Sequence, residues 1–285
     1  MNRDWERNFF PNPLTEEVIV NIIVCVKEII DPELPPDNFK IDPTRNIGLC
    51  PDSVPSVINP FDEQAMEAAL RIKDVLGGKI TILSLGNNLH REVVKKPLTM
   101  GADELILLED EAYAGGDSWS TANALALAIN KIGNYDLVLC GRQAADWDAG
   151  QVGLGIAEIL NLPSVTLARK IEVTDGKARV ERVTPDGYEI IEVVLPALIT
   201  VSNELGQPRY AILEKILESV KKEPTIWKPK DIGIEPGRTE SKGRQLNLLK
   251  LFQPVREGKC EIIGGDTVEE AAVNLTLRLR EAKVV

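Results

Sequence analysis

The chain alternates short runs of aliphatic residues with amphipathic stretches, and this alternation constrains the fold more than any other feature. Four runs rich in Ile, Val and Leu predict buried strands over 18–26, 79–86, 104–110 and 136–141. The intervening and following stretches predict helices over 61–77, 118–133 and 149–161. Strands that alternate with helices in this way predict an α/β fold with a doubly wound, mostly parallel sheet.

The pattern changes after Pro163. Extended segments with turn signals predict an antiparallel meander up to residue 202, followed by a helix over 211–222. Residues 223–246 are rich in Pro, Gly and Lys and indicate a surface arm, which composition leaves open as a partner-wrapping segment or a flexible tail. A capping box of Thr267 and Glu270 predicts a last helix. We expect an N-terminal extension (1–20), an α/β domain with an antiparallel extension (21–222) and a C-terminal arm and helix (223–285).

Charge and composition exclude several functional classes. The net charge of −11 disfavours nucleic-acid binding. His90 is the single histidine, so no multi-histidine metal site can form, and its charged surroundings predict a surface position at a helix start. No metal is expected.

The cysteines and the apolar runs bear on the compartment. Four separated cysteines without a CxxC pair indicate unpaired thiols in a reducing compartment, with Cys25 and Cys140 in buried strands. No run of 18 apolar residues occurs, so we expect no membrane span, and the N-terminus lacks a signal-peptide core. We therefore expect a cytoplasmic protein.

The segment CGRQAADWDAGQVG (140–153) follows a predicted strand and opens a predicted helix. A helix N-terminus offers backbone N–H groups to an anion such as a phosphate. Asp146 and Asp148 would repel a phosphate, so we expect them to cap N–H groups or to bind ribose hydroxyls. An ordinary capped loop between a strand and a helix is the alternative. The first helical turn would contain Gln151, Val152 and Gly153.

Three other segments have similar positions. Asn59 precedes a helix whose first turn contains Asp62, and simple helix capping is the alternative role for Asp62. Asp117 opens another helix, again with N-capping as the alternative, and Gly86 ends the second predicted strand. Because the carboxyl ends of such strands converge on one crevice, these segments together favour a nucleotide site. Neither GxGxxG nor GxxxxGK[ST] is present, which disfavours a conventional dinucleotide-binding dehydrogenase or a P-loop hydrolase.

Several separated motifs occur in an order typical of one family. They are NIIVCVKEI (21–29), VPSVINPFDEQAMEAALRIKD (54–74), MGADELILL (100–108), CGRQAADWDAGQVG (140–153) and NELGQPRYAIL (203–213). Through them the chain resembles the beta subunit of electron-transfer flavoproteins. The resemblance implies a flavodoxin-like or nucleotide alpha-hydrolase-like sheet, a partner alpha subunit that holds an FAD, and a C-terminal arm and helix packed on that partner.

The resemblance also implies a nucleotide in this subunit. One branch of the family holds a structural AMP, and the electron-bifurcating branch holds a second FAD and accepts electrons from NADH. The segment GGDSWST (115–121) resembles the bifurcating branch, so we favour FAD, with AMP as the alternative. The residues that the resemblance assigns to cofactor binding are Cys25, Val26, Lys27, Asn59, Asp62, Leu85, Gly86, Asp117, Ser118, Thr121, Gly141, Arg142, Gln143, Asp146, Asp148, Gln151, Val152 and Gly153.

The implied function is electron bifurcation without a catalytic acid or base in this chain. Electrons would pass to the alpha-subunit FAD and an acyl-CoA dehydrogenase-type partner, and to a low-potential acceptor such as ferredoxin. Leu205, expected to be exposed, would dock the dehydrogenase, and a leucine folded back onto the sheet is the alternative. The alternatives are a non-bifurcating carrier with structural AMP and a stand-alone nucleotide-binding protein of the universal-stress type. The chain departs from the family at Arg142, where lysine is common, and at the bulky Trp147.

Overall fold

A computed structural model describes residues 19–35, 38–44, 46–49, 56–234, 244–254 and 260–284. The chain divides into two units, one formed by residues up to Lys40 together with Gly48–Leu248, the other by Ile41–Ile47 and Leu249–Val285. The expected N-terminal extension lies outside the described residues apart from Ile19 and Val20, and Cys50 also lies outside them.

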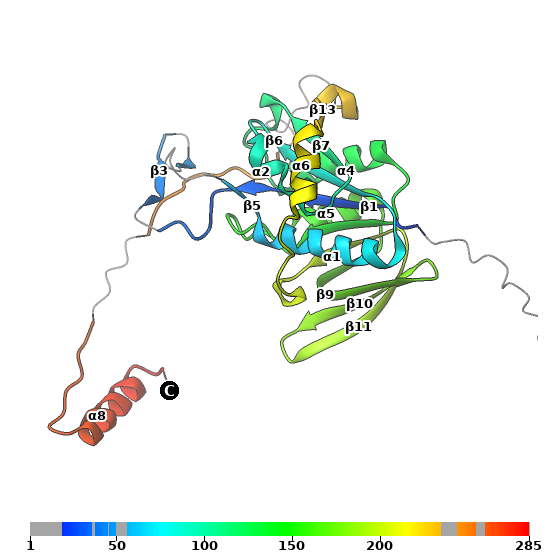
Figure 1. The fold of residues 1–285 in the computed structure, drawn as a ribbon. Helices are drawn as coiled ribbons and strands as arrows, with labels where there is room; N and C mark the ends of the chain where they lie inside the picture. Colours follow the sequence, from blue (N-terminus) through cyan, green and yellow to red (C-terminus); the bar gives the residue numbers. More distant parts are fainter. Residues whose placement is uncertain are drawn as a thin grey trace, which may run out of the picture. The chain divides into compact units, whose positions relative to one another are not determined.

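The first unit is built on a sheet with the strand order β11-β10-β9-β12-β8-β1-β6-β7-β13 (Figure 1). Neighbouring strands are parallel from β13 to β12 and into the first part of β9, and β9, β10 and β11 are antiparallel to one another. The predicted α/β fold with an antiparallel extension is therefore confirmed. The strands are β1 (Ile22–Val26), β6 (Ile80–Gly86), β7 (Glu104–Glu109), β8 (Leu137–Gly141), β9 (Ser164–Thr174), β10 (Lys177–Thr184), β11 (Gly187–Val194), β12 (Ala197–Val201) and β13 (Thr225–Trp227).

Helices cover both faces of the parallel strands. Helix α1 (Pro60–Leu76) lies on one face, and α4 (Ser118–Ile132) and α5 (Val152–Leu160) lie on the other (Figure 1). All five residues of β1 are buried, and they alternate between the two hydrophobic cores. This two-sided burial explains why the strand is a continuous aliphatic run.

The helices begin and end close to their predicted positions, with one exception. Helix α5 begins at Val152, three residues after the predicted start. Asp148 and Gly150 have φ angles of 50° and 62°, which an α-helix cannot contain. The residues before Val152 therefore form a loop over the carboxyl end of β8.

The predicted meander is right for β9, β10 and β11 but wrong for β12. Strand β12 returns to the parallel sheet and lies between β8 and β9. The aliphatic run is interrupted at Leu195-Pro196. Its residue pattern does not indicate that the second half, which forms β12, belongs to the buried core. The hairpin of β10 and β11 extends beyond the parallel strands (Figure 1).

The expected surface arm begins differently from its prediction. Strand β13 forms the edge of the sheet beside β7, so the expected boundary after residue 222 falls inside the first unit.

His90 is exposed and precedes α2, as predicted. The shorter elements are β2 (Glu28–Ile29), β3 (Lys40–Asp42), β4 (Ile47–Leu49), β5 (Val57–Ile58), α2 (Arg91–Val94), α3 (Lys96–Met100), η2 (Glu111–Tyr113), η3 (Asn203–Leu205), α6 (Leu213–Lys221), η4 (Pro229–Ile232) and α8 (Val268–Glu281).

The close approach of α4 and α5 yields a prediction. A Cβ atom on Gly155 would lie 2.8 Å from the Cβ of Ala122, so Gly155→Val should overpack this contact and lower the free energy of unfolding by about 1–3 kcal/mol. Equilibrium urea unfolding measures the change. Leu154→Ala, an exposed change in the same turn, should stay within about 0.5 kcal/mol. Equal losses for both variants would contradict the packing interpretation.

Candidate functional site

The strand order reverses at β1, because the chain continues to β6 and β7 on one side and later adds β8 on the other. Ligands of doubly wound sheets bind outside the carboxyl ends of the strands at such a reversal. The loops that follow Val26 and Gly141 are therefore the candidate site.

Asp62, in the first turn of α1, joins the ends of these two strands. Its carboxylate accepts hydrogen bonds from the backbone N–H of Lys27 at 2.8 Å and of Gly141 at 3.0 Å. A Cβ atom on Gly141 would lie 2.4 Å from the Asp62 Oδ1, so glycine is required there for helix packing. Burial raises the pKa of Asp62 to about 7, against the opposing effects of the backbone donors, Asn59 and the Lys27 charge.

Asn59 fastens the loop after β8. Its side-chain amide donates to the Gln143 carbonyl at 2.8 Å and accepts from the Ala145 N–H at 3.1 Å. Asn59 is only 1% exposed and makes no side-chain bond that caps α1, although asparagine is a favourable N-cap. The sequence could not show that its side chain is committed to a distant loop.

One ion pair and one hydrogen bond restrain the two aspartates of this loop. The Lys27 ammonium lies 2.7 Å from an Asp146 carboxylate oxygen, and the Gln143 amide donates to Asp148 at 2.7 Å. The Lys27 and Asp146 side chains are both partly exposed. The Lys27 charge is therefore paired with Asp146 at the partly exposed edge of this loop.

Arg142 carries unused hydrogen-bonding capacity. Its guanidinium lies over the Phe61 ring at 5.4 Å, and NH1 makes only long bonds of 3.4 Å to Ser202 and Asn203. Within the described residues its buried Nε has no hydrogen-bond partner. Because buried donors are usually satisfied, this cation is suited to an anionic ligand.

The N-terminus of α5 is also uncapped. Gln151 precedes the helix without a side-chain bond to it, so the first-turn N–H groups, which have no intrahelical acceptor, are left for another partner. Gly153 itself faces the sheet, where a Cβ atom would lie 3.0 Å from Thr200 Cγ2 and 3.6 Å from Cys140 Cβ. Its lack of a side chain is explained by packing, and only its backbone is available to a ligand.

The loop before α4 is organised around a helix cap. The Asp117 carboxylate accepts from Ser120 N–H at 2.9 Å, and from the N–H groups of Gln245 and Leu246 at 2.6 and 2.8 Å. Burial raises its pKa, but these donors together lower it below the ordinary value. The N-cap alternative for Asp117 is thus confirmed, while Ser118 and Thr121 lie half-buried in the first turn.

The strand-end residues have mostly structural surroundings. Cys25 and Cys140 are buried neighbours on β1 and β8, as predicted, and a bond from Cys25 together with burial raises the pKa of the Cys140 thiol. Val26 belongs to the α1-side core, and Leu85 is half-buried. A Cβ atom on Gly86 would lie 2.6 Å from Leu89 Cδ2, so this end of β6 is filled by a side chain.

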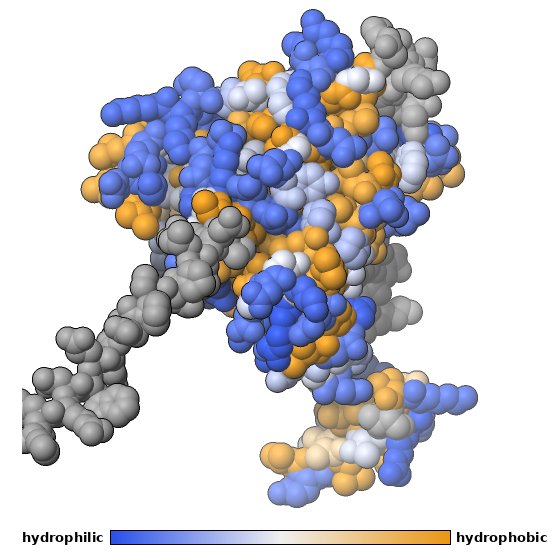
Figure 2. Space-filling view, turned by 90° about the vertical axis from the view of Figure 1, so that its right-hand side faces the viewer, coloured by the Kyte–Doolittle hydropathy of each residue, from blue (hydrophilic) through white to orange (hydrophobic). Residues whose placement is uncertain are grey.

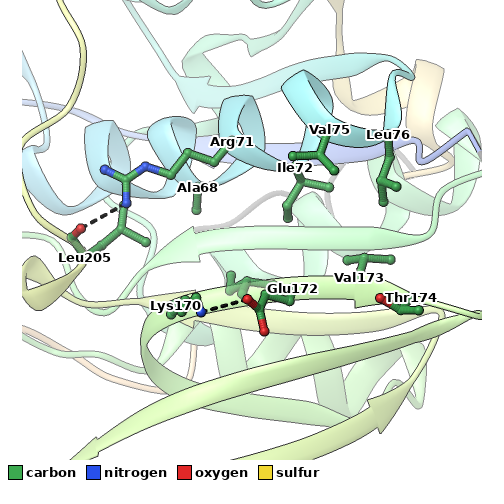
Figure 3. Close-up of a pocket in the computed structure, with 11 residues that line it drawn as sticks. Ala68, Arg71, Ile72, Val75, Leu76, Lys170, Glu172, Val173, Thr174 and Leu205 are labelled. Atoms are coloured by element: carbon green, nitrogen blue, oxygen red, sulfur yellow. Dashed lines mark hydrogen bonds and ion pairs between the residues drawn. The ribbon is translucent and has the colours of Figure 1, made fainter.

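Leu205 does not have the exposed side chain that the sequence suggested. It is 8% exposed and packs into the core on the α1 side. It also lines a groove of about 430 Å³ between α1 and β9, where Ile72, Val75 and Val173 contribute apolar surface (Figure 3). This groove lies beside α1 and the extension rather than at the strand ends, so we do not assign the nucleotide to it.

The comparisons identify the family to which the chain belongs. Residues 48–232 match the family described as electron transfer flavoprotein domain. The chain is 40% identical to the caffeyl-CoA reductase-Etf complex subunit CarD of Acetobacterium woodii, with 93% of this chain and 100% of the relative covered. It is 41% identical to the electron transfer flavoprotein subunit beta of Thermoanaerobacterium thermosaccharolyticum, over the same shares.

The chain belongs to the electron transfer flavoprotein beta-subunit family. A further relative, 33% identical, is the acryloyl-CoA reductase electron transfer subunit gamma of Anaerotignum propionicum, with 93% of this chain and 100% of that protein covered. In the described part of this beta-subunit chain, no three His, Cys, Asp or Glu side chains cluster as a metal site would require. None of the described helices has the length and apolarity needed to cross a bilayer.

The buried Asp62 makes stability depend on pH. Its raised pKa means that the folded state binds a proton more tightly than the unfolded state, so ionisation destabilises the fold. Between pH 6 and 8 this group should lower the free energy of unfolding by about 1 kcal/mol as the pH rises. Urea unfolding across this range, compared with Asp62→Asn, isolates the contribution. Identical pH slopes in the two proteins would contradict it.

Proposed function

We propose that this beta subunit binds an adenine nucleotide at the carboxyl ends of β1 and β8, and that the nucleotide is FAD. The observation that carries this proposal is the set of unused donors there: the Arg142 Nε and the uncapped first turn of α5. Together with the Lys27 ammonium they provide the positive potential that a diphosphate requires.

Each part of the site would have a distinct task. The α5 N–H groups and Arg142 would hold the phosphates, and Asp146 or Asp148 would accept from ribose hydroxyls after release from their present partners. A bound FAD would supply the redox chemistry, namely acceptance of electrons from NADH and their division between two acceptors. The chain itself would bind, orient and shield the cofactor.

One observation favours AMP as the alternative. Asp117 already accepts from the Ser120 N–H and from two N–H groups of residues 245–246, so its carboxylate is committed within the chain. The Ser120 hydroxyl of the segment that suggested FAD also donates to Asp117, so Ser118 and Thr121 are the residues of that segment whose hydroxyls are not bonded to it. A non-bifurcating carrier with structural AMP would need no contact from this segment.

The exposed apolar surface of α8 supports binding to a partner subunit. Helix α8 buries none of its residues, and Val268, Val273 and Leu277 are exposed. An amphipathic helix without a core of its own gains stability only on a partner. We therefore assign α8 and the C-terminal arm to the alpha subunit. Ferredoxin would be the low-potential acceptor. The compartment would be the cytoplasm, because Cys25 and Cys140 are free thiols and reducing compartments keep thiols unpaired.

Helix α6 provides a docking surface in place of Leu205. Leu213, Leu217 and Val220 recur at helical spacing, and Leu213 is 70% exposed. Hydrophobic residues also reach the surface among hydrophilic ones on the face drawn in Figure 2. A stripe of exposed aliphatic side chains on one helix can anchor a partner. We assign this stripe, called here the α6 surface, to the acyl-CoA dehydrogenase-type partner.

Analysis of the co-purified nucleotide tests the cofactor proposal. The heterodimer of this chain with its alpha subunit should contain two FAD molecules by mass spectrometry and absorbance, and NADH alone should bleach the flavin. One FAD and one AMP would establish the alternative. A heterodimer whose beta subunit holds no nucleotide would contradict both.

A pair of leucine variants tests the docking surface. Leu213→Ala should raise the KM of caffeyl-CoA reductase, used as the probe enzyme, for the heterodimer at least about fivefold without changing its cofactor content. Leu205→Ala should instead lower the free energy of unfolding by about 2–5 kcal/mol, because Leu205 is buried. Val75→Ala, an exposed change on α1, is the control. An unchanged KM for Leu213→Ala would refute the α6 surface as the docking site.

A further inference from the structure

The segment 203–209, which leads into the α6 surface, is fastened to α1 by charged groups. Arg209 donates to the Glu67 carboxylate from its backbone N–H at 3.1 Å and from its Nε at 2.8 Å. Its NH2 also lies 2.8 Å from the carboxylate of Asp74, about two turns further along α1. Both acidic partners thus come from the same helix.

Glu67 is the centre of this arrangement. It is 5% exposed and accepts a second guanidinium, that of Arg71, at 2.9 Å. A buried carboxylate is stable only when its charge is paired and its oxygens are hydrogen-bonded. Burial raises the pKa of Glu67, but the bonds from Arg209 and Arg71 lower it below its ordinary value, so the group stays ionised.

Arg71 extends the arrangement to the other end of the segment. Its NH1 donates to the Leu205 carbonyl at 3.1 Å, while the Leu205 side chain packs inward (Figure 3). The segment is therefore held by Leu205 at one end and by Arg209 at the other. The next residue, Tyr210, is 92% exposed, and the α6 surface begins at Leu213.

We propose that Glu67 is a positioning residue for partner docking, which sets the position of Tyr210 and the α6 surface through Arg209 and Arg71. The inference rests on the proposed docking of a dehydrogenase at α6. Glu67 would not touch the partner. It would fix the docking surface before the partner arrives, which lowers the ordering cost of association.

The test uses Glu67→Gln in the heterodimer with its alpha subunit, and Glu63→Gln as the matched control. Glu63 lies on the same helix but pairs with Lys96 of α3, and not with Arg71 or Arg209. Glu67→Gln should accelerate amide hydrogen exchange of residues 206–213 and raise the KM of caffeyl-CoA reductase for the heterodimer about fivefold, with kcat and cofactor content unchanged. Glu63→Gln should change neither quantity.

A double-mutant cycle separates this inference from the docking proposal. If Glu67 acts through the α6 surface, Glu67→Gln should raise KM much less in a Leu213→Ala background than in the wild type. Additive effects, or a Glu67→Gln protein with unchanged exchange and KM, would overturn the inference while Leu213→Ala still reports docking. An unchanged KM for Leu213→Ala would overturn the docking proposal itself. Arg209→Gln, which removes the same pair from the other side, should reproduce the Glu67→Gln result if that variant folds poorly.

Discussion

The hydrogen bonds of the Asp62 carboxylate to the ends of β1 and β8 are the constraint on which the candidate site depends. They hold together two strands at the reversal of the sheet, and Gly141 is needed because nothing larger fits beside that carboxylate. Asn59, three residues earlier, fastens the following loop. The first turn of α1 thereby positions residues 141–146 next to the start of α5, where we propose that the nucleotide binds.

This arrangement changes the roles of several residues. We expected three residues, Asn59, Asp62 and Gly141, to contact the cofactor. In the structure the side chains of Asn59 and Asp62 bond to groups of the chain itself, and Gly141 packs against Asp62. Arg142 keeps an unpaired donor, which makes it the stronger candidate for direct binding. The proposed site therefore consists of a few unpaired donors, which a larger buried polar network holds in place.

The parallel core was predictable because local signals agree there. Aliphatic runs such as β1 are buried on both faces, and glycines such as Gly77 end helices, so sequence and structure coincide. Strand β12 could not be separated from β11 by pattern, because its place depends on pairing with β8, which is distant in sequence. The exposure of Leu205 was also unpredictable, since tertiary packing decides it. The amphipathic spacing of Leu213, Leu217 and Val220, by contrast, is visible in the sequence and is the signal on which the proposed docking surface rests.

The most direct test of the account is a crystal structure of the heterodimer with its co-purified nucleotide. The account predicts phosphate density within hydrogen-bond distance of the first-turn N–H groups of α5 and of the Arg142 guanidinium, with Asp62 still bonded to Lys27 and Gly141. Phosphates bound elsewhere, with the Arg142 Nε paired to a protein group, would contradict it.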